Sequence, residues 1–557
     1  MTMMMMRWGL GAILATLLLG CGSGGSSSGS SGVPPPAAPP PAPPPPPPPP
    51  PPEHRVVFIA DRVVDEEYHI YSCKADGSDL VDLCGSLVAG GDVFSFKTSP
   101  DGTHVTLSAD RDTNNFTERY VVPIAGGTLV KLDGNVPGVL IAVSWSSDSL
   151  RIAYLATYGS SAQELFVSDR DGANNVKVSG AMTAGGNMGN DFAWAPDGSR
   201  IAYAADQNTD GVLEVFTSLP DGTGNVRVCG ALTAGREVRI ETLQWAPDSS
   251  RLCYVADQDT DDIFELYTVD PAGNQNVKAS GTMVAGGDVI TPTSGIVMDR
   301  YWAPDASRIS YVADQDSDDV FELYTSLPGG GGNVKVSGSL AAGGDVMSDF
   351  AWAPDSSRIA FRSDKEVDET FELYAAFPTG APTYQLSGSL VSGGDVQLSF
   401  VHRSFEWAPD SSRIAYLAFQ RQANLVELFT SQKDGSGNVL VSGDNPTCSS
   451  SYPLRWAPNG ARILFYGLRE ASTFELFTCV PDGSIMDKVS GTMVAGGDID
   501  PNVAFLWAPS SYYVVYAADQ LTDGRVEVFS SLPDGQSNVK ISGSMVAGGN
   551  AASLDVH

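Results

Sequence analysis

Residues 301–314 read Tyr-Trp-Ala-Pro-Asp-Ala-Ser-Arg-Ile-Ser-Tyr-Val-Ala-Asp, and an acidic segment then leads to Phe-Glu-Leu-Tyr-Thr-Ser at 321–326. A glycine run follows, then Asn-Val-Lys-Val-Ser-Gly at 333–338 and Ala-Ala-Gly-Gly-Asp at 341–345. Short runs of β-branched and aromatic residues separated by Pro-Asp, Asp-rich and Gly-rich segments are typical of antiparallel strands and their turns. This stretch therefore predicts one four-stranded antiparallel meander.

The same unit recurs from residue 55 to the end of the chain. Its tryptophan position returns about every 50 residues, with Thr98 in place of the first tryptophan. The repeated tryptophans are Trp145, Trp194, Trp245, Trp302, Trp352, Trp407, Trp456 and Trp507. The predicted strands are nearly continuous apolar runs, which indicates sheets buried on both faces, and radial stacking of sheets in a β-propeller provides such burial.

The two ends of the repeat array complement each other. Residues 55–61 align with the second strand of the unit, and residues 548–557 align with the first strand and end at the tryptophan position. We therefore expect an all-β fold in which residues 55–557 form one ring of about ten four-stranded antiparallel blades, closed by the terminal strand. Two smaller propellers in tandem are the alternative, because ten blades exceed the usual four to eight.

The first 20 residues have the pattern of a secretory signal. Arg7 precedes an apolar run at 8–19, and Gly20-Cys21 follows. The apolar run is too short to span a bilayer, which needs about 20 residues. The ending Leu18-Leu19-Gly20-Cys21 resembles the lipobox of bacterial lipoproteins, and this resemblance implies that Cys21 is lipidated. An ordinary signal peptide followed by a chance cysteine is the alternative.

Residues 21–54 read as a linker between this signal and the repeats. Residues 22–32 are Gly and Ser, which form a flexible coil, and residues 34–52 are Pro with three Ala, which form a stiff extended helix. Gly22, which follows Cys21, favours the outer membrane by the same resemblance. We therefore expect a protein of the bacterial cell envelope, anchored to the outer membrane by its lipid and facing the periplasm or the cell surface.

The run Trp-Ala-Pro-Asp-Ser-Ser-Arg-Ile-Ala-Tyr at 407–416 resembles the WD40-like (PD40) repeat of the TolB family, and this resemblance covers residues 55–557. It implies a propeller in an envelope setting. TolB itself carries an α/β domain before its propeller, and here the proline-rich linker leads directly into a blade. Related propeller peptidases carry a hydrolase domain, which this sequence also lacks. No binding residues are carried over from the family.

The chain has 66 acidic residues against 33 Lys and Arg, a net charge of −33. Such a balance disfavours nucleic acid, because phosphate binding depends on clustered Lys and Arg. Alternating strand directions place the loops between second and third strands on one face with the blade-to-blade connections, so this face should be acidic. Its Asp-x-Asp-x-Asp segments are candidate calcium ligands, with turn capping as the alternative. These candidates are Asp257, Asp259, Asp261, Asp314, Asp316 and Asp318.

Six cysteines follow Cys21, and an exported protein can oxidise them. Cys73 and Cys84 fall on the third and fourth strands of one predicted blade, so a disulfide between them is expected. Cys448 with Cys479 is a second, weaker pair. Buried free thiols are the alternative for Cys229 and Cys253.

The sequence favours a non-enzymatic scaffold that presents its acidic face or channel mouth to an envelope protein or glycan. The alternative is a carbohydrate- or peptide-processing enzyme that depends on a divalent cation. Irregular segments would carry such a site, and the candidates are residues 290–300 and residues 397–406 with His402. The repeat itself names no ligand, since fold does not imply function.

Overall fold

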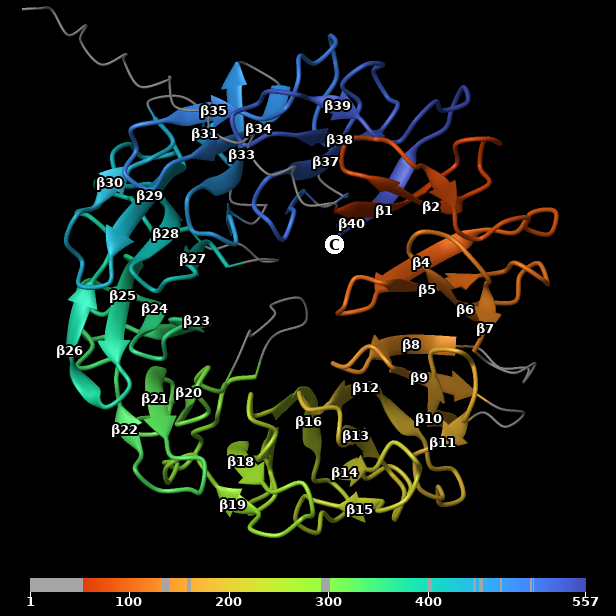
Figure 1. Cartoon of the computed structure of the whole chain (residues 1–557). Coiled ribbons are helices and arrows are strands. Elements are labelled where there is room, and N and C mark those ends of the chain that lie inside the picture. Colours follow the sequence, from red (N-terminus) through yellow and green to blue (C-terminus); the bar gives the residue numbers. More distant parts are fainter. Residues whose placement is uncertain are drawn as a thin grey trace, which may run out of the picture. The chain divides into compact units, whose positions relative to one another are not determined.

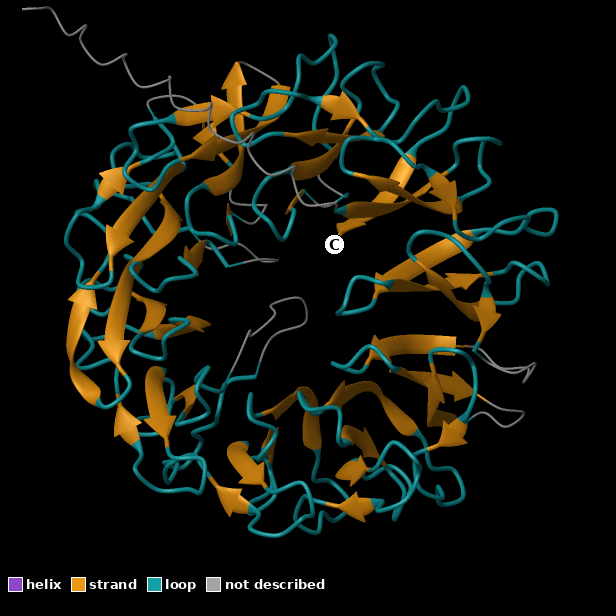
Figure 2. Cartoon of the chain, in the orientation of Figure 1, coloured by secondary structure: helices purple, strands orange, loops and turns teal. Residues whose placement is uncertain are grey.

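The computed structural model describes residues 54–132, 140–157, 162–291, 301–397, 403–443, 447–449, 454–470, 473–500, 503 and 505–557. Within this part of the chain the strands form ten antiparallel sheets arranged as the blades of one ring (Figure 1). Every described segment is strand, turn or loop (Figure 2), and none is a helix long and apolar enough to cross a bilayer. The predicted ten-bladed β-propeller is confirmed, in preference to two tandem rings.

The blades are numbered in chain order, with strands given from the inner to the outer one. Blade 1 is β40 (Ala551–Val556), β1 (Arg55–Ala60), β2 (His69–Lys74) and β3 (Val81–Asp82). Blade 2 is β4 (Val93–Thr98), β5 (His104–Ala109), β6 (Glu118–Pro123) and β7 (Val130–Lys131). Blade 3 is β8 (Leu140–Trp145), β9 (Arg151–Thr157), β10 (Gln163–Asp169) and β11 (Val176–Lys177). Blade 4 is β12 (Met188–Trp194), β13 (Ile201–Ala205), β14 (Glu214–Ser218) and β15 (Val226–Arg227). Blade 5 is β16 (Val238–Trp245), β17 (Leu252–Ala256), β18 (Glu265–Val269) and β19 (Val277–Lys278).

The second half of the ring contains the irregular blades. Blade 6 is β20 (Ile309–Ala313), β21 (Glu322–Ser326) and β22 (Val334–Lys335), with single bridges at Val289 and Trp302 in place of an inner strand. Blade 7 is β23 (Val346–Trp352), β24 (Ile359–Ser363), β25 (Glu372–Phe377) and β26 (Gly380–Gln385). Blade 8 is β27 (Phe405–Trp407), β28 (Arg413–Ala418), β29 (Glu427–Gln432) and β30 (Val439–Leu440). Blade 9 has a split inner strand, β31 (Thr447–Cys448) and β32 (Arg455–Trp456), followed by β33 (Ile463–Glu470), β34 (Thr473–Cys479) and β35 (Met486–Lys488). Blade 10 is β36 (Leu506–Trp507), β37 (Val514–Ala518), β38 (Glu527–Ser531) and β39 (Val539–Lys540).

The ring is closed by the last strand, as the sequence predicts. β40 pairs with β1 in antiparallel register, with Val556 opposite Val56 and Leu554 opposite Phe58. Blade 1 therefore takes its inner strand from the end of the chain and its other three strands from the beginning. Closure of this kind removes the free sheet edge that β1 would otherwise expose.

The hydrophobic core lies between neighbouring blades. At the joint of blades 7 and 8, Ala360 and Leu373 of blade 7 pack with Tyr416 and Ala418 of blade 8. Both faces of each sheet are covered in this way, which explains why the strands lack a clear polar face. The ring thus has a chain of equivalent small cores, one at each joint.

Each repeated tryptophan ties its blade to the preceding one. The indole Nε1 of Trp407 donates to the carbonyl oxygen of Ala351 at 3.1 Å, and all eight repeated tryptophans make the equivalent bond. A buried indole N–H needs an acceptor. The carbonyl oxygen of the neighbouring inner strand therefore fixes how deeply each indole side chain sits between its two blades.

The joint between blades 1 and 2 uses different chemistry. Thr98 occupies the tryptophan position, and its Oγ1 donates to Asp555 at 2.5 Å and contacts Nε2 of His557. His557 is also 2.9 Å from Asp555. Burial opposes ionisation of Asp555, but the hydrogen bonds from His557 and Thr98 outweigh it and lower the pKa of this carboxyl.

Candidate functional site

The loops between second and third strands and the blade-to-blade connections meet on one face, as predicted. Asp314, at the end of β20, accepts a hydrogen bond from the backbone N–H of Asp288 in the preceding connection, at 2.5 Å. Its second oxygen accepts the N–H of Asp319 in its own loop at 3.1 Å. Asp314 is buried, and both of its oxygens are used to hold backbone.

The Gly-Gly-Asp residues extend this linkage to the previous blade. The side chain of Asp288 accepts the N–H of Phe264, which precedes β18 of blade 5, at 2.6 Å. Blade 5 is thereby connected through Asp288 to Asp314 of blade 6. Burial raises the pKa of Asp288, and the negative charge of Asp314 adds to the effect. Two carboxylates are thus held close together by the backbone N–H groups that they accept.

The linkage repeats around the described part of the ring. In seven blades an Asp directly after the second strand accepts the N–H of the residue at the Gly-Gly-Asp position. These residues are Asp61, Asp110, Asp206, Asp257, Asp314 and Asp364, which are buried, and Asp519, which is half-buried. Asx-type capping of tight turns explains why Asp is repeated here.

The six predicted calcium ligands divide into three structural roles. Asp257 and Asp314 are the buried caps, and Asp257 accepts the N–H of Glu237 at 2.7 Å. Asp259 and Asp316 lie 3.6 Å from Lys278 and 3.2 Å from Lys335, respectively. Asp261 and Asp318 are exposed. Among the described residues, neither set of three brings its carboxylates within reach of one shared ion.

The exposed aspartates recur at one position in the loop, four residues after the buried cap. A Cβ on Gly286 would lie 2.5 Å from the Asp318 carboxylate, and Gly286 has a φ of +91°. The carboxylate therefore occupies the space that only glycine leaves free, at a backbone conformation that favours glycine. We call this set the acidic crown: Asp65, Asp210, Asp261, Asp318, Asp368 and Asp523, with Asn114 in the same place in blade 2.

The opposite face carries the Pro-Asp turns and contains pockets between blades. One, of about 430 Å³, is lined by Trp352, Pro354, Arg403, Glu406 and Trp407, with Pro304 and Ala351. Burial lowers the pKa of Arg403 to about 10 and raises that of Glu406. A second, of about 310 Å³, is lined by Pro196, Gln244, Trp245, Pro247 and Trp302.

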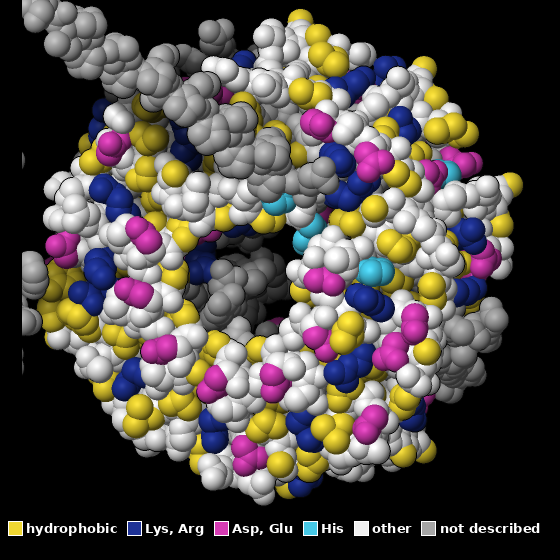
Figure 3. All heavy atoms as spheres, in the orientation of Figure 1, with side chains coloured by type: hydrophobic (Ala, Val, Ile, Leu, Met, Phe, Trp, Pro, Cys, Tyr) yellow, Lys and Arg dark blue, Asp and Glu magenta, His cyan; other side chains and the backbone are white. Residues whose placement is uncertain are grey.

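A hollow centre is visible in the face seen in Figure 3. On that face the Lys and Arg side chains are interspersed with Asp and Glu, and no patch of a single sign dominates.

The predicted disulfide partners are not brought together. Cys73 lies in the core between blades 10 and 1, whereas Cys84 lies in the core between blades 1 and 2. Both are buried and free, as are Cys448, Cys479, Cys229 and Cys253. Cys84 instead contacts His69 and Asp82. These three form a cluster that the sequence did not suggest.

The segments that were candidates for a catalytic site are only partly described. Residues 292–300 and 398–402, including His402, lie outside the described residues, as do Cys21 and the whole of 1–53. Arg403 and Glu406, at the end of the second segment, line the larger pocket. Arg403 donates to the carbonyl of Phe350 at 3.2 Å, and Glu406 accepts the N–H of Trp456 at 3.1 Å.

Comparison with known proteins gives no family assignment. No family model matches the sequence, and no curated protein matches it. Similar solved structures include a "putative TolB" from Agrobacterium tumefaciens, at 16% identity and a TM-score of 0.26 over 47% of this chain and 84% of that one. A eukaryotic initiation factor has 10% identity and a TM-score of 0.46 over 90% and 98%. Dipeptidyl peptidase 4 of Porphyromonas gingivalis has 12% identity and a TM-score of 0.43 over 83% and 61%. At such values these similarities carry no information about function.

Proposed function

We propose that the protein is a lipid-anchored, non-enzymatic scaffold of the bacterial cell envelope that binds a partner through its acidic face. The signal-like residues 1–20, the lipobox-like ending at Cys21 and the proline-rich linker support the anchoring, and so does the TolB-like repeat. In this arrangement the lipid holds the chain at the membrane, and the linker separates the ring from it.

The observation that carries the binding proposal is the acidic crown. Its six exposed aspartates occupy equivalent loop positions in blades 1, 4, 5, 6, 7 and 10. Like charges repeated on one face favour a partner of opposite charge and speed its association. The net charge of −33 acts in the same direction. The partner is therefore a protein or glycan surface with basic groups.

Repetition also favours binding over catalysis. An active site needs one set of groups that differ in role, whereas the crown offers the same group many times. The buried aspartates behind it are occupied with backbone N–H groups, as Asp314 is with Asp288 and Asp319. Such loops repeat the same hydrogen-bonded arrangement, which suits an extended docking surface.

The anchoring is tested by metabolic labelling with an alkyne fatty acid. The full chain should incorporate the label and fractionate with membranes, and Cys21→Ser should lose both properties. The control is Gly22→Ser alone, which changes the neighbouring residue but keeps Cys21 and should leave labelling intact. Equal labelling of the Cys21→Ser variant would contradict the lipid anchor.

The binding face is tested by site-specific photo-crosslinking in intact cells. A photoreactive residue is placed at Ser317, in the crown of blade 6, or at Ser436, in an exposed turn of blade 8 on the opposite face. We expect a discrete adduct from position 317 and none from 436. The adduct should be lost when all six crown aspartates are changed to Asn, and kept when Asp171, Asp221, Asp434 and Asp534 of the opposite face are changed to Asn.

Two results would overturn the binding proposal: equal adducts from both faces, or an adduct from position 317 that survives the six-fold Asn variant. Thermal unfolding of both Asn variants is the control that checks whether each remains folded. Once the partner is identified, its affinity for the purified chain should fall as the salt concentration rises. Salt screens the attraction between exposed charges, and at 0.1 M this attraction is largely lost beyond about 10 Å.

A further inference from the structure

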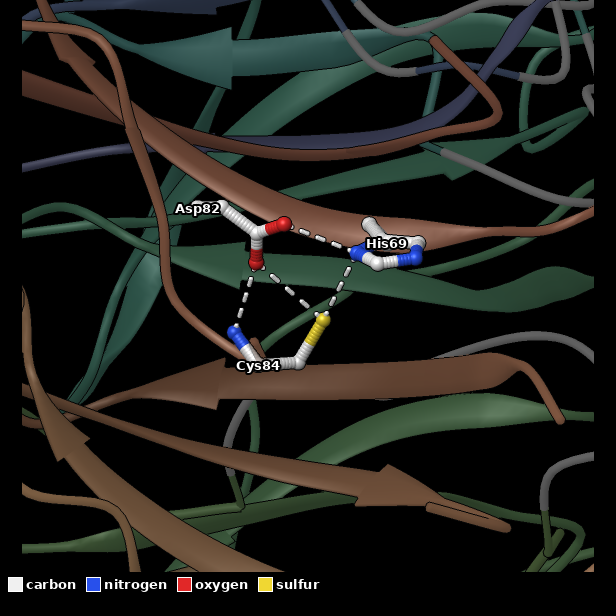
Figure 4. Close-up of side chains that lie close together, drawn as sticks. All are labelled: His69, Asp82 and Cys84. Atoms are coloured by element: carbon white, nitrogen blue, oxygen red, sulfur yellow. Dashed lines mark hydrogen bonds and ion pairs between the residues drawn. The ribbon is translucent and has the colours of Figure 1, made fainter. Parts of the chain in front are cut away.

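The cluster of His69, Asp82 and Cys84 lies at the outer edge of blade 1 (Figure 4). His69 begins β2, Asp82 ends β3, and Cys84 follows two residues later. Nδ1 of His69 is 2.8 Å from Oδ2 of Asp82 and 3.3 Å from Sγ of Cys84, and this sulfur is 3.3 Å from the other oxygen of Asp82. Imidazole nitrogen, carboxylate oxygen and thiol sulfur thus point at one another across the two strands.

The other blades have different residues at the three positions that align with His69, Asp82 and Cys84. Each of them has a Glu where blade 1 has His69, and seven of these Glu residues form an ion pair with Lys or Arg at the position of Asp82. The pairs are Glu118–Lys131, Glu164–Lys177, Glu214–Arg227, Glu265–Lys278, Glu322–Lys335, Glu475–Lys488 and Glu527–Lys540. At the position of Cys84, seven blades have Ser, as at Ser337 of blade 6. Three aligned positions have therefore changed together in blade 1, each to a residue that binds metal.

The contacts of the imidazole distinguish a metal site from a catalytic triad. In a Cys-His-Asp triad the thiol and the carboxylate contact opposite nitrogens of the ring. Here Asp82 and Cys84 both contact Nδ1. Three donors converging on one point are what a bound ion requires, since ligands about 2.0–2.3 Å from a tetrahedral ion lie roughly 3.3–3.7 Å apart. Small side-chain movements from the distances above give that spacing.

The other ring nitrogen has the partner that a metal-binding histidine requires. Nε2 of His69 is 3.1 Å from Oε1 of Glu67. A histidine that binds metal through one nitrogen usually donates the N–H of the other to a carboxylate, which fixes the tautomer and the ring orientation. Glu67 is placed to do this, so that Nδ1 presents its lone pair to the ion.

The surroundings allow an ion to enter and hold it. Cys84 is 1% exposed and the His69 side chain 12%, whereas the Asp82 side chain is 36% exposed. The carboxylate side is therefore open to solvent, and it offers both an entry path and a fourth position for water. A thiolate and an aspartate together balance the charge of a divalent ion. Thiolate with imidazole favours zinc, whereas calcium takes oxygen ligands.

We propose that Nδ1 of His69, a carboxylate oxygen of Asp82 and Sγ of Cys84 bind one zinc ion, with Glu67 positioning His69 and water completing the tetrahedron. The ion links β2 to the two-residue strand β3 and so clamps the outer edge of the blade at which the ring closes. This site is independent of the acidic crown and of any partner.

Zinc binding is measured on the full chain, purified in detergent and stripped with a chelator. Titration with a competing chromogenic chelator should give one tight site per chain, and Co²⁺ should give a thiolate-to-metal charge-transfer band. The triple change His69→Glu, Asp82→Lys and Cys84→Ser restores the default residues of the other blades, so it should fold while losing the band and at least 100-fold in zinc affinity. Zinc should raise the unfolding temperature of the wild type but not of this variant.

Matched controls make the test decisive. Cys229 occupies the Cys84 position in blade 4, so Cys229→Ser should leave the band and the affinity unchanged. Glu67→Gln should weaken zinc binding about tenfold without removing the thiolate band, because Glu67 does not touch the ion. The proposal fails if the wild type binds no zinc at micromolar concentration, if the triple variant binds as well as the wild type, or if Cys229→Ser abolishes the band.

Discussion

Arg55 and His557, which lie near the beginning and at the very end of the ring, exchange two backbone hydrogen bonds. The N–H of Arg55 donates to the carbonyl of His557 at 2.8 Å, and the N–H of His557 donates back to Arg55 at 2.9 Å. In other blades the same pair of positions belongs to one turn, as with Ala303 and Arg308 of blade 6. In blade 1 this contact therefore joins the two ends of the repeat array, whereas in the other blades it joins residues of a single turn.

This closure should decide the stability of the whole ring. Leu554 of β40 is buried in the joint between blades 10 and 1. Changing Leu554 to Asp places a charge in that core and should destabilise the protein by at least about 3 kcal/mol. Thermal unfolding and size-exclusion chromatography are the measurements, the latter because an open β1 edge promotes association. Ala552→Asp, at an exposed position of the same strand, should change the stability by about 0.5 kcal/mol or less. Equal effects of the two changes would contradict the closure.

The buried and exposed aspartates of one loop should differ sharply on substitution. Asp314→Ala removes the acceptor of two backbone N–H groups, from Asp288 and Asp319, and should cost about 2–3 kcal/mol. Asp318→Ala removes an exposed carboxylate and should cost about 0.5 kcal/mol or less. Denaturant unfolding measures both.

The same two variants test the calcium hypothesis. Because both oxygens of Asp314 are engaged by backbone, we expect millimolar calcium to leave the unfolding temperature of the wild type unchanged relative to magnesium. A calcium-dependent rise that disappears in both variants would instead establish the Asp-x-Asp-x-Asp segments as metal ligands.

The pH dependence of stability should reveal which carboxylates of the blade connections destabilise the fold when they are ionised. Burial raises the pKa of Asp345, and the charge of Asp364 adds to the rise. A carboxyl with a raised folded-state pKa destabilises the fold once ionised, and this cost disappears as the pH falls below its unfolded value of about 4. Asp345→Asn keeps the acceptor for Phe321, as Asn187 does for Gln163 at 2.7 Å. The unfolding temperature should rise by about 1 °C at pH 7 and be unchanged near pH 4.

The turn aspartates should behave with the opposite sign. Hydrogen bonds from the hydroxyl and N–H of Ser412 lower the pKa of Asp410. A lowered pKa contributes stability above the unfolded value that is lost as the pH falls through the folded value. Asp410→Asn should therefore lower the unfolding temperature at pH 7. The difference from the wild type should begin to shrink near pH 4 and vanish only below the lowered folded-state pKa. Parallel shifts of the two Asn variants at every pH would refute both assignments.

The tryptophan bond between blades should be measurable one joint at a time. Trp407→Phe keeps an aromatic ring in the joint of blades 7 and 8 but removes the donor to Ala351. We expect a loss of about 1–2 kcal/mol, from the unsatisfied buried carbonyl and the smaller ring. Phe405→Leu, in the same core without a hydrogen bond, supplies the pure packing comparison. A loss for Trp407→Phe no greater than for Phe405→Leu would show that the bond adds nothing.

The ring could be predicted from sequence because the repeat encodes it many times over. The spacing of Trp407 and its equivalents gave the number of blades, and residues 55–61 and 548–557 gave the closure. What repetition could not reveal was the use of each repeated carboxylate. Asp314 and Asp318 have the same residue type four positions apart, yet they differ in burial. Asp314 is buried and accepts the N–H groups of Asp288 and Asp319, whereas Asp318 is exposed and lies over Gly286.

The cluster around His69 escaped prediction for the opposite reason. A search for metal ligands at repeated positions, or at fixed spacing of His, passes over three ligands that occur once and lie up to 15 residues apart. Pairing of β2 with β3 brings them together. The signal was present as a departure from the repeat: aligned against Glu322, Lys335 and Ser337, blade 1 alone reads His, Asp and Cys. An alignment of the ten repeats, read for positions at which one blade differs from the others, would have identified this cluster.

The distinct chemistry of the Thr98 joint bears on how the chain assembles correctly. Eight joints share the same tryptophan hydrogen bond, so this bond alone would not distinguish one insertion place for a terminal strand from another, within one molecule or in a second. Asp555 and His557 instead recognise a threonine that occurs once at this position. The last strand therefore has a single destination, and the ring is protected from closing early with a blade left out or from exchanging its end with another molecule.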